Sequence, residues 1–231
     1  MIRKRVRSYK VGFRGDVNGW HNSLVDVPAF IIGNSPSLDD IDLKPLKHHF
    51  TIGINRAFYV IDPTILMWQD SELWWNHRAE IGRTKAIKFC KDLADPKGRF
   101  YHFKLANGGY KLPERPSLLH GRGSTGPLAF QLAWIMGCNP IVMLGMDCRY
   151  RDGKTDFYGK NPSHKPHTLQ NCSRGLEWIK NCKCNREVIT CSTSKVFDIA
   201  QSFEQVLGSL PQDKPWNYES LRKKILGKDD S

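Results

Sequence analysis

The sequence predicts an α/β fold with a mostly parallel central sheet, helices on both faces and a long lid-like loop. Short apolar runs at residues 29–32, 50–54 and 65–68 are each followed within two residues by Asn or Asp, as expected for buried parallel strands. A glycine-rich loop at 121–126 precedes a stretch that is apolar on nearly every face, which is typical of a buried helix. Stretches with helical spacing alternate with the strands, so we expect a Rossmann-like architecture.

The elements are expected in a regular order along the chain. Strands are predicted at residues 29–32, 50–55, 65–70, 86–90, 100–103, 141–146 and 187–191. Helices are predicted from Ser37 towards Leu46, where the start has capping-box spacing, and at 72–83, 127–136, 174–182, 203–207 and 218–226. The loops at 104–118 and 148–168 are long for a single domain, so both are candidate lids.

Three segments differ in composition. Residues 1–27 read as a basic N-terminal arm, 28–210 as a single Rossmann-like domain with its lid near 148–168, and 211–231 as a C-terminal helical tail. The formal net charge is +12 and the pI about 9.4, which favours an anionic partner such as a nucleotide, nucleic acid or membrane surface. Much of this charge lies in the two ends, so part of it can belong to solvated arms.

The sequence also indicates where the protein works. The start of the chain lacks the apolar core of a signal peptide, and no run is long enough to span a bilayer. We therefore expect a soluble cytoplasmic protein, of a bacterium or of a bacterium infected by a virus. The seven cysteines are expected to be reduced, and their spacing is not that of a common zinc module, so no metal site is predicted. The sequence leaves open whether the chain forms a homo-oligomer.

Polar residues follow the predicted strands at one edge of the sheet. Asn34, Asn55, Asp70 and Asp147 each stand where a strand ends, and ligands bind at this edge in open α/β sheets. The loop before the buried helix adds an arginine, small hydroxyl residues and free backbone N–H groups, a combination suited to a phosphate. A structural interpretation is also open, because Asn tolerates left-handed turns, Asp caps helices and a glycine-rich loop can simply connect two elements.

The order of these motifs resembles that of a known group of proteins. The motifs are Gly33-Asn34-Ser35-Pro36-Ser37-Leu38, Ile54-Asn55, Arg122-Gly123-Ser124-Thr125-Gly126, Leu144-Gly145-Met146-Asp147, a histidine-containing loop and Cys191-Ser192-Thr193-Ser194. Over about residues 28–208 the chain resembles the bacterial lipooligosaccharide sialyltransferases and the related MptE-like superfamily. That superfamily includes 6-hydroxymethylpterin pyrophosphokinases and flagellar glycosylation proteins.

The resemblance implies roles for particular residues. Asn34, flanked by Gly33 and Ser35, and Asn55 would contact the nucleotide of a donor. Arg122 and Thr125, with Ser124 and Gly126 beside them, would lie next to the donor. Tyr150 and Tyr158 would stabilise the leaving phosphate, and His167, rather than His164, would act as base on the acceptor hydroxyl. The third strand departs from the family pattern, because Asp70 stands where an asparagine is usual, so the donor need not carry sialic acid.

Three functions follow as hypotheses. The first is a glycosyltransferase that moves a sugar from a nucleotide-sugar donor to a hydroxyl acceptor, with a modified base in DNA as an acceptor suggested by charge alone. The second is an ATP- and Mg²⁺-dependent pyrophosphokinase in which Asp70 and Asp147 hold the metal; the first needs no metal, although Mg²⁺ would be compatible with it. The third is a nucleic-acid-binding protein without catalysis.

Overall fold

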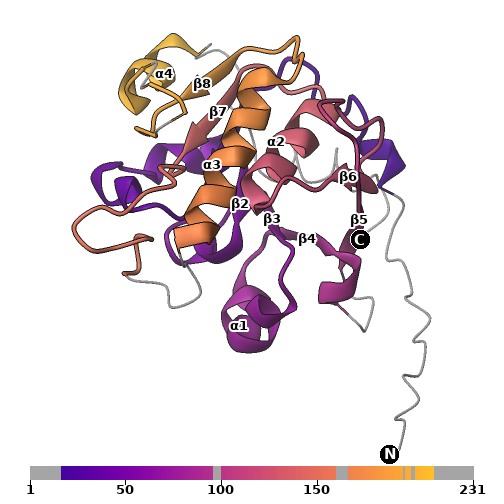
Figure 1. Cartoon of the computed structure of the whole chain (residues 1–231), viewed down its shortest axis with the longest axis horizontal. Helices are drawn as coiled ribbons and strands as arrows, with labels where there is room; N and C mark the ends of the chain where they lie inside the picture. The colour runs from indigo at the N-terminus through magenta and orange to yellow at the C-terminus, as the bar shows by residue number, and fades with distance from the viewer. Residues whose placement is uncertain (1–16, 96–99, 160–165, 195, 199–200, 211–231) are drawn as a thin grey trace, which may run out of the picture.

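One eight-stranded sheet organises the chain, for which a computed structural model describes residues 17–95, 100–159, 166–194, 196–198 and 201–210 (Figure 1). The strands are β1 (Ala29–Ile32), β2 (Phe50–Ile54), β3 (Ile65–Trp68), β4 (Ile87–Lys91), β5 (Tyr101–Ala106), β6 (Leu118–His120), β7 (Ile141–Leu144) and β8 (Val188–Thr190). Their spatial order is β6-β5-β4-β3-β2-β1-β7-β8, and every described pairing is parallel. The predicted α/β Rossmann-like class is therefore confirmed.

The chain reverses its direction across the sheet once. It leaves β1, adds β2 to β6 on one side, and then crosses back through a helix to β7, which pairs with the other side of β1. The loop that follows β1 leads towards β2, whereas the loop that follows β7 leads towards β8, in the opposite direction across the sheet. In open α/β sheets a crevice forms at such a reversal, on the edge where the strands end.

Helices cover both faces of the sheet, as predicted. They are α1 (Ser71–Arg83), α2 (Thr125–Ile135), α3 (Pro166–Asn181) and α4 (Phe203–Ser209). Alternate residues of β1 define the two faces: Ala29 and Ile31 pack in the core beneath α2 and α3, whereas Phe30 and Ile32 pack in the core that includes α4. Figure 1 shows α2 and α3 side by side. Ten of the eleven residues of α2 are buried, because the sheet covers one side of the helix and α3 covers another.

The segment before β1 belongs to the domain rather than to an arm. A 3₁₀ turn, η1 (Asn18–Trp20), places Val17, Trp20 and Leu24 in the same core as α2. The backbone N–H groups of Asn22 and Leu24 donate to carbonyls at the end of α2. The arm boundary predicted at residue 27 is therefore wrong for residues 17–27. Residues 1–16 and the predicted helical tail 211–231 lie outside the described residues.

Two predicted elements have a different form. The helix expected from Ser37 towards Leu46 is a pair of 3₁₀ turns, η2 (Pro36–Asp40) and η3 (Lys44–His48), separated by Ile41 in extended conformation. Pro36 and Pro45 each stand in the first turn of their 3₁₀ element, where the missing N–H of proline is not needed. Helix α3 begins at Pro166, eight residues before the predicted start, so the end of the predicted lid is helical.

Strand β6 lies in and just beyond a segment expected to be a loop. Its three residues are too few to show an alternating pattern in the sequence. As the edge strand, β6 has no neighbouring strand on one side, and Gln131 of α2 takes the place of that neighbour. The Gln131 side-chain amide accepts from His120 N at 2.7 Å and donates to His120 O at 2.9 Å. A buried glutamine thus satisfies the backbone that an edge strand leaves exposed.

Candidate functional site

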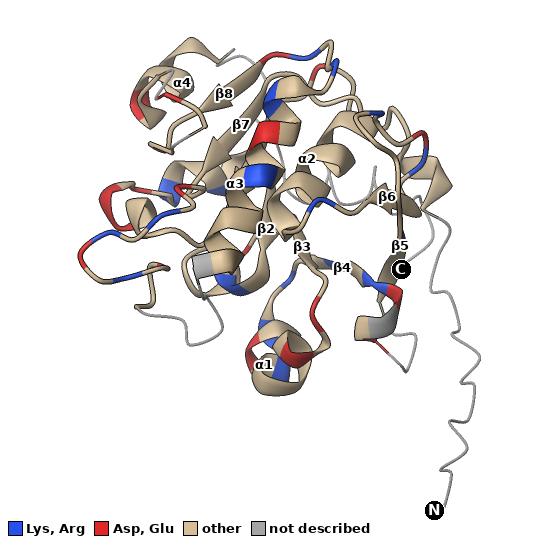
Figure 2. Cartoon of the chain, in the orientation of Figure 1, with Lys and Arg blue, Asp and Glu red and all other residues tan. Residues whose placement is uncertain are grey.

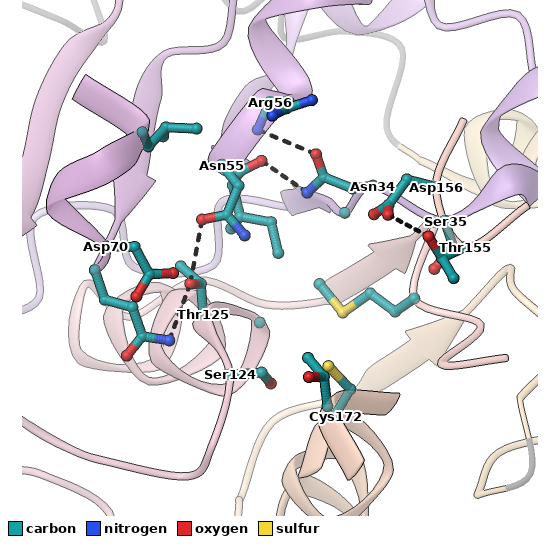
Figure 3. Close-up of a pocket in the computed structure, with 18 of the residues that line it drawn as sticks. Asn34, Ser35, Asn55, Arg56, Asp70, Ser124, Thr125, Thr155, Asp156 and Cys172 are labelled. Carbon is teal, nitrogen blue, oxygen red and sulfur yellow. Dashed lines mark hydrogen bonds between the residues drawn. The ribbon is translucent and has the colours of Figure 1, made fainter. Parts of the chain in front are cut away.

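A cavity of about 720 Å³ opens at the edge where the central strands end (Figure 3). The ends of β1, β2, β3 and β7, the start of α2, the lid and α3 all contribute to it. It contains most of the predicted site residues: Gly33, Asn34, Ser35, Asn55, Asp70, Ser124, Thr125, Gly126 and Tyr158. Residues separated by up to about 125 positions in the chain therefore share one hollow, as the parallel-sheet prediction required.

Two walls of the cavity come from different elements of the fold. The β-edge wall consists of Gly33, Asn34, Asn55, Thr125 and Gly145, at the ends of β1, β2 and β7 and the start of α2. The α1 wall consists of Ser71, Glu72, Asn76 and His77, all on α1.

Asn34 makes hydrogen bonds that connect the ends of β1 and β2 and the lid. Its side-chain Nδ2 donates to Ile54 O at 3.0 Å, and its Oδ1 accepts from Arg56 N at 3.1 Å. Its backbone carbonyl accepts from Phe157 N of the lid at 2.8 Å. The side chain is buried, and its hydrogen bonds fix the ends of β1 and β2 and the base of the lid relative to one another. This is the structural role that the sequence left open for Asn34.

Asn55 presents its side chain to the start of α2. Its φ is +50°, a left-handed conformation that Asn tolerates better than most residues. Thr125 Oγ1 donates to Asn55 Oδ1 at 3.3 Å and accepts from Gln69 Nε2 at 3.3 Å. Among the described residues, Asn55 Nδ2 makes no hydrogen bond, so its two N–H groups are available to a ligand.

The start of α2 forms the floor of a potential anion site. Ser124 is the N-cap, and its side chain makes no capping bond. The residues that follow, Thr125 and Gly126, line the cavity, while Pro127 has no N–H to satisfy. Backbone N–H groups in the first helical turn carry partial positive charge and attract phosphates.

Two glycines allow the β-edge wall to close tightly. A Cβ added to Gly33 would lie 2.0 Å from the carbonyl oxygen of Gly145, because β1 and β7 run side by side up to this point. Gly145 itself has a φ of +63°, and a Cβ there would meet Leu38 at 2.5 Å. A side chain at position 33 would separate β1 from β7 where the cavity begins, and one at position 145 would displace Leu38 of η2.

Arg122 and Asp147 do not line the cavity. The Arg122 guanidinium lies 4.9 Å from the centre of the Trp178 ring and donates to Gly109 O, and burial lowers its pKa. Trp178 Nε1 donates to the same carbonyl at 2.9 Å, so Arg122 holds the loop after β5 against α3. Asp147 accepts from Ser37 N at 3.2 Å and from Ser37 Oγ at 2.5 Å. Burial raises the pKa of Asp147, and these hydrogen bonds partly oppose the rise.

The lid contributes Tyr158 but not Tyr150. Tyr158 lines the cavity, and the Arg56 guanidinium lies 4.5 Å from the centre of its ring. Tyr150 is 45% exposed and is not a lining residue. The buried Asp156, which sequence reasoning did not single out, lines the cavity and accepts from Thr155 Oγ1 at 2.8 Å.

His167 lies in the first turn of α3, where it is exposed and does not line the cavity. His164 falls outside the described residues. The helix presents Leu169, Cys172 and Leu176 to the cavity instead. Their spacing of three and four residues is that of one helical face, and this signal, with a proline at the first position, could have located the start of α3.

Sequence reasoning also missed residues on the far side of the cavity. Gln69, Arg56, Asn76, His77 and Lys91 line it, as does Cys148. Gln69 follows β3 directly, so the pattern of polar strand ends could have found it. Cys148 lies beside Cys172, and the hydrogen bond that its thiol makes to Cys172, followed by burial, raises the pKa of the Cys148 thiol. The α1 residues carry no such signal, because polar residues on an exposed helix are common.

No metal cluster or membrane span is found in the part of the chain that the structure describes. None of its His, Cys, Asp and Glu residues form a group of three or more that could hold a metal ion. None of its helices has both the length and the apolar character needed to cross a bilayer.

The fold and the cavity together define an α/β Rossmann-like protein with a cavity lined by polar residues at the edge of its sheet. No protein-family profile and no curated protein sequence matches the chain. A solved structure, the MAf glycosyltransferase from Magnetospirillum magneticum AMB-1, is similar with a TM-score of 0.57 and 15% sequence identity. The similarity covers 90% of this chain and 40% of that chain, so the present chain spans well under half of the length of that protein. The likeness shows a shared fold.

Proposed function

We propose that the chain is a glycosyltransferase that moves a sugar from a nucleotide-sugar donor to a hydroxyl acceptor. The observation that carries this proposal is the meeting of Asn34, Asn55 and the start of α2 in one cavity, where a nucleotide and its phosphate can be held together. A structural neighbour that is a glycosyltransferase supports the same class.

The described groups suit the departure of a nucleotide. When the bond between sugar and phosphate breaks, negative charge develops on the phosphate oxygen. The first-turn N–H groups of α2 and the hydroxyl of Tyr158 can donate hydrogen bonds to that charge, each worth about 2 to 4 kcal/mol in the transition state. The free amide N–H groups of Asn55 would then contact the nucleotide. Arg122, which the resemblance places next to the donor, and Tyr150, which it assigns to the leaving phosphate, would have to move to reach it.

The acceptor is proposed from charge. A modified base in DNA, such as a hydroxymethylpyrimidine, fits the net charge of +12. On the described elements, however, Lys and Arg are interspersed with Asp and Glu, as α1 and α3 show in Figure 2. Contacts to a DNA backbone would therefore rely on the N-terminal segment, where residues 3–14 hold six Lys and Arg residues and no Asp or Glu.

The geometry favours a transferase over a pyrophosphokinase. The kinase hypothesis needs Asp70 and Asp147 as joint metal ligands, but Asp70 lines the cavity while both oxygens of Asp147 accept from Ser37. The chain has no Gly-x-x-x-x-Gly-Lys-(Ser/Thr) loop, so any use of ATP would not be of the P-loop kind.

The first experiment is a thermal-shift panel of nucleoside mono- and diphosphates and nucleotide sugars, with and without Mg²⁺. We expect stabilisation by at least one nucleotide in the absence of metal. The variant Asn55→Ala should weaken that binding about tenfold, because one hydrogen-bonded contact is lost. Asn22→Ala is the matched control, since Asn22 is exposed, lies outside the cavity and has a similar φ of +52°.

The other outcomes identify the alternatives. A strict requirement for ATP with Mg²⁺ would support the pyrophosphokinase and contradict the transferase. Salt-sensitive DNA binding that is unchanged in Asn55→Ala, with no nucleotide bound, would support a nucleic-acid-binding protein without catalysis.

A further inference from the structure

Helix α1 changes geometry where it borders the cavity. Trp74 and Ile81 are buried against the sheet, as in a regular amphipathic helix. Between them, His77 has a φ of −132° and a ψ of 25°, which are not helical values. His77 and its neighbour Asn76 line the cavity. The departure from helical geometry thus coincides with the point at which α1 meets the site.

The imidazole of His77 is held in a defined orientation. Its Nδ1 lies 3.1 Å from the hydroxyl of Tyr59. The ring centres of Phe58 and Tyr59 lie 5.9 and 5.8 Å from its own, so two aromatic rings pack around it. A hydrogen bond at one nitrogen and the tilted and edge-on contacts with the two aromatic rings fix which way the other nitrogen points.

That other nitrogen, Nε2, lacks a partner. It is buried, and among the described residues nothing hydrogen-bonds to it. A buried polar atom without a partner costs about 1 to 3 kcal/mol, so a hydroxyl that binds beside His77 would relieve this cost. Because Nε2 is covered, such a hydroxyl reaches it when a neighbouring side chain changes rotamer, as interface side chains commonly do on binding.

The charges around His77 favour the neutral ring. Burial lowers its pKa, and the positive charge of Arg56 lowers it further, while Glu80 on the same helix acts in the opposite direction. From the packed segment Asn55–Tyr59, the groups that face it are Arg56 and the Tyr59 hydroxyl. An imidazole that is neutral near pH 7 can accept a proton.

We infer that His77 is the general base of the proposed glycosyl transfer, with Tyr59 as its positioning residue. This inference rests on the proposed function. In the required tautomer, Nδ1–H of His77 donates to the Tyr59 hydroxyl oxygen and Nε2 carries the lone pair. The acceptor oxygen forms a bond to the anomeric carbon, the bond from that carbon to the phosphate oxygen breaks with its electron pair leaving on the nucleotide, and the acceptor proton passes to His77 Nε2.

The structure gives His77 three features that His167, the histidine implied by the resemblance, lacks. His77 lines the cavity, and its ring is oriented by a hydrogen bond and by aromatic packing. Its Nε2 has no hydrogen-bond partner among the described residues. His167 is exposed and does not line the cavity.

The test follows nucleotide release from CMP-sialic acid, UDP-glucose, UDP-N-acetylglucosamine and GDP-mannose, with water and a hydroxymethylated oligonucleotide as acceptors, across pH 4.5 to 9. We expect His77→Gln to lower turnover about 100-fold, to remove the fall in rate at acidic pH, and to leave nucleotide affinity unchanged. Tyr59→Phe should lower turnover less and shift the acidic limb of the pH profile. His21→Gln, an exposed histidine outside the cavity, is the control.

Each outcome bears on a different claim. If His167→Gln rather than His77→Gln removes the acidic limb, or if His77→Gln retains full turnover, the assignment of the base is overturned and the transferase stands. If the wild-type protein releases nucleotide from no donor and binds none, the proposed function itself fails. If His77→Gln does not fold, Tyr59→Phe decides, because an unchanged pH profile in that variant contradicts the inference.

Discussion

Side chains in the β-edge wall hydrogen-bond to one another and to the backbone, whereas those in the α1 wall project from an exposed helix. Asn34 joins the ends of two strands and the lid, and Asn55, Thr125 and Gln69 form a chain of hydrogen bonds. In the α1 wall, Glu72 and Asn76 are exposed, and the only cavity-lining histidine among the described residues, His77, keeps one nitrogen unpaired.

This difference suggests that the two walls of the cavity bind different substrates. A wall whose side chains are fixed by hydrogen bonds, with the Nδ2 group of Asn55 left for the ligand, keeps its shape, which suits a ligand bound in the same way in every cycle, such as a nucleotide. A wall with unpaired groups can adapt to a second substrate and can exchange protons with it. The following predictions test whether the two walls differ in stability and coupling as this interpretation requires.

The largest effect is expected at the closest backbone approach of the β-edge wall. Gly33→Ala places a Cβ 2.0 Å from Gly145 O, and neither backbone can retreat without separating β1 from β7. We expect a loss of about 3 kcal/mol in the free energy of unfolding, measured by urea denaturation. Gly19→Ala, where a Cβ meets nothing within 4 Å, should change stability by less than about 0.5 kcal/mol. Equal effects of both variants would show that the approach is not tight.

The second prediction compares one asparagine from each wall. Asn34→Ala removes two side-chain hydrogen bonds and leaves Arg56 N and Ile54 O unpaired, so about 2 to 3 kcal/mol of stability should be lost. Asn76→Ala, an exposed residue of the α1 wall, should cost less than about 0.5 kcal/mol. Chemical denaturation of the two variants under the same conditions measures both. A costly Asn76→Ala would contradict the distinction between the walls.

The third prediction concerns coupling. A double-mutant cycle with Asn55→Ala and Thr125→Val should give an interaction energy of about 0.5 to 1.5 kcal/mol, because their side chains share a hydrogen bond. The cycle of Asn55→Ala with Asn76→Ala, across the two walls, should be additive within about 0.3 to 0.5 kcal/mol. Strong coupling across the cavity would show that the walls form one unit.

The smallest effect is a dependence of stability on pH. His77 and His49 both have lowered pKa values, for His49 through burial and then the charge of His48. A lowered pKa means that the folded state binds the proton less readily than the unfolded state. The contribution of these two histidines to stability is therefore fully present above about pH 6.5 and is lost as the pH falls. The melting temperature should therefore fall on acidification below pH 6.5, and the fall should be shallower in His77→Gln. His21→Gln should retain the wild-type slope, and a wild-type slope in His77→Gln as well would exclude a contribution from His77.

Local sequence was sufficient for most of the sheet and for the start of the site. Apolar runs such as Phe50–Ile54 and Ile65–Trp68 form strands because burial on both faces leaves few alternatives, and the polar residues that follow them lie at one edge because all the strands are parallel. The apolar stretch after Gly126 fixed α2 as a buried helix for the same reason. These features depend on residues near one another in the chain.

The direction of particular side chains was decided by the tertiary structure. Asp147 is bound by Ser37, 110 residues away, and Arg122 is held by Trp178 and the loop after β5, so neither enters the cavity that the local pattern assigned to it. His77 joins the site because Tyr59 and Phe58 orient its ring. The sequence by itself determined which segments bury their apolar side chains, since hydrophobic periodicity is local. Only the folded chain determined which polar groups remain for a ligand, since each hydrogen-bond partner comes from a distant segment.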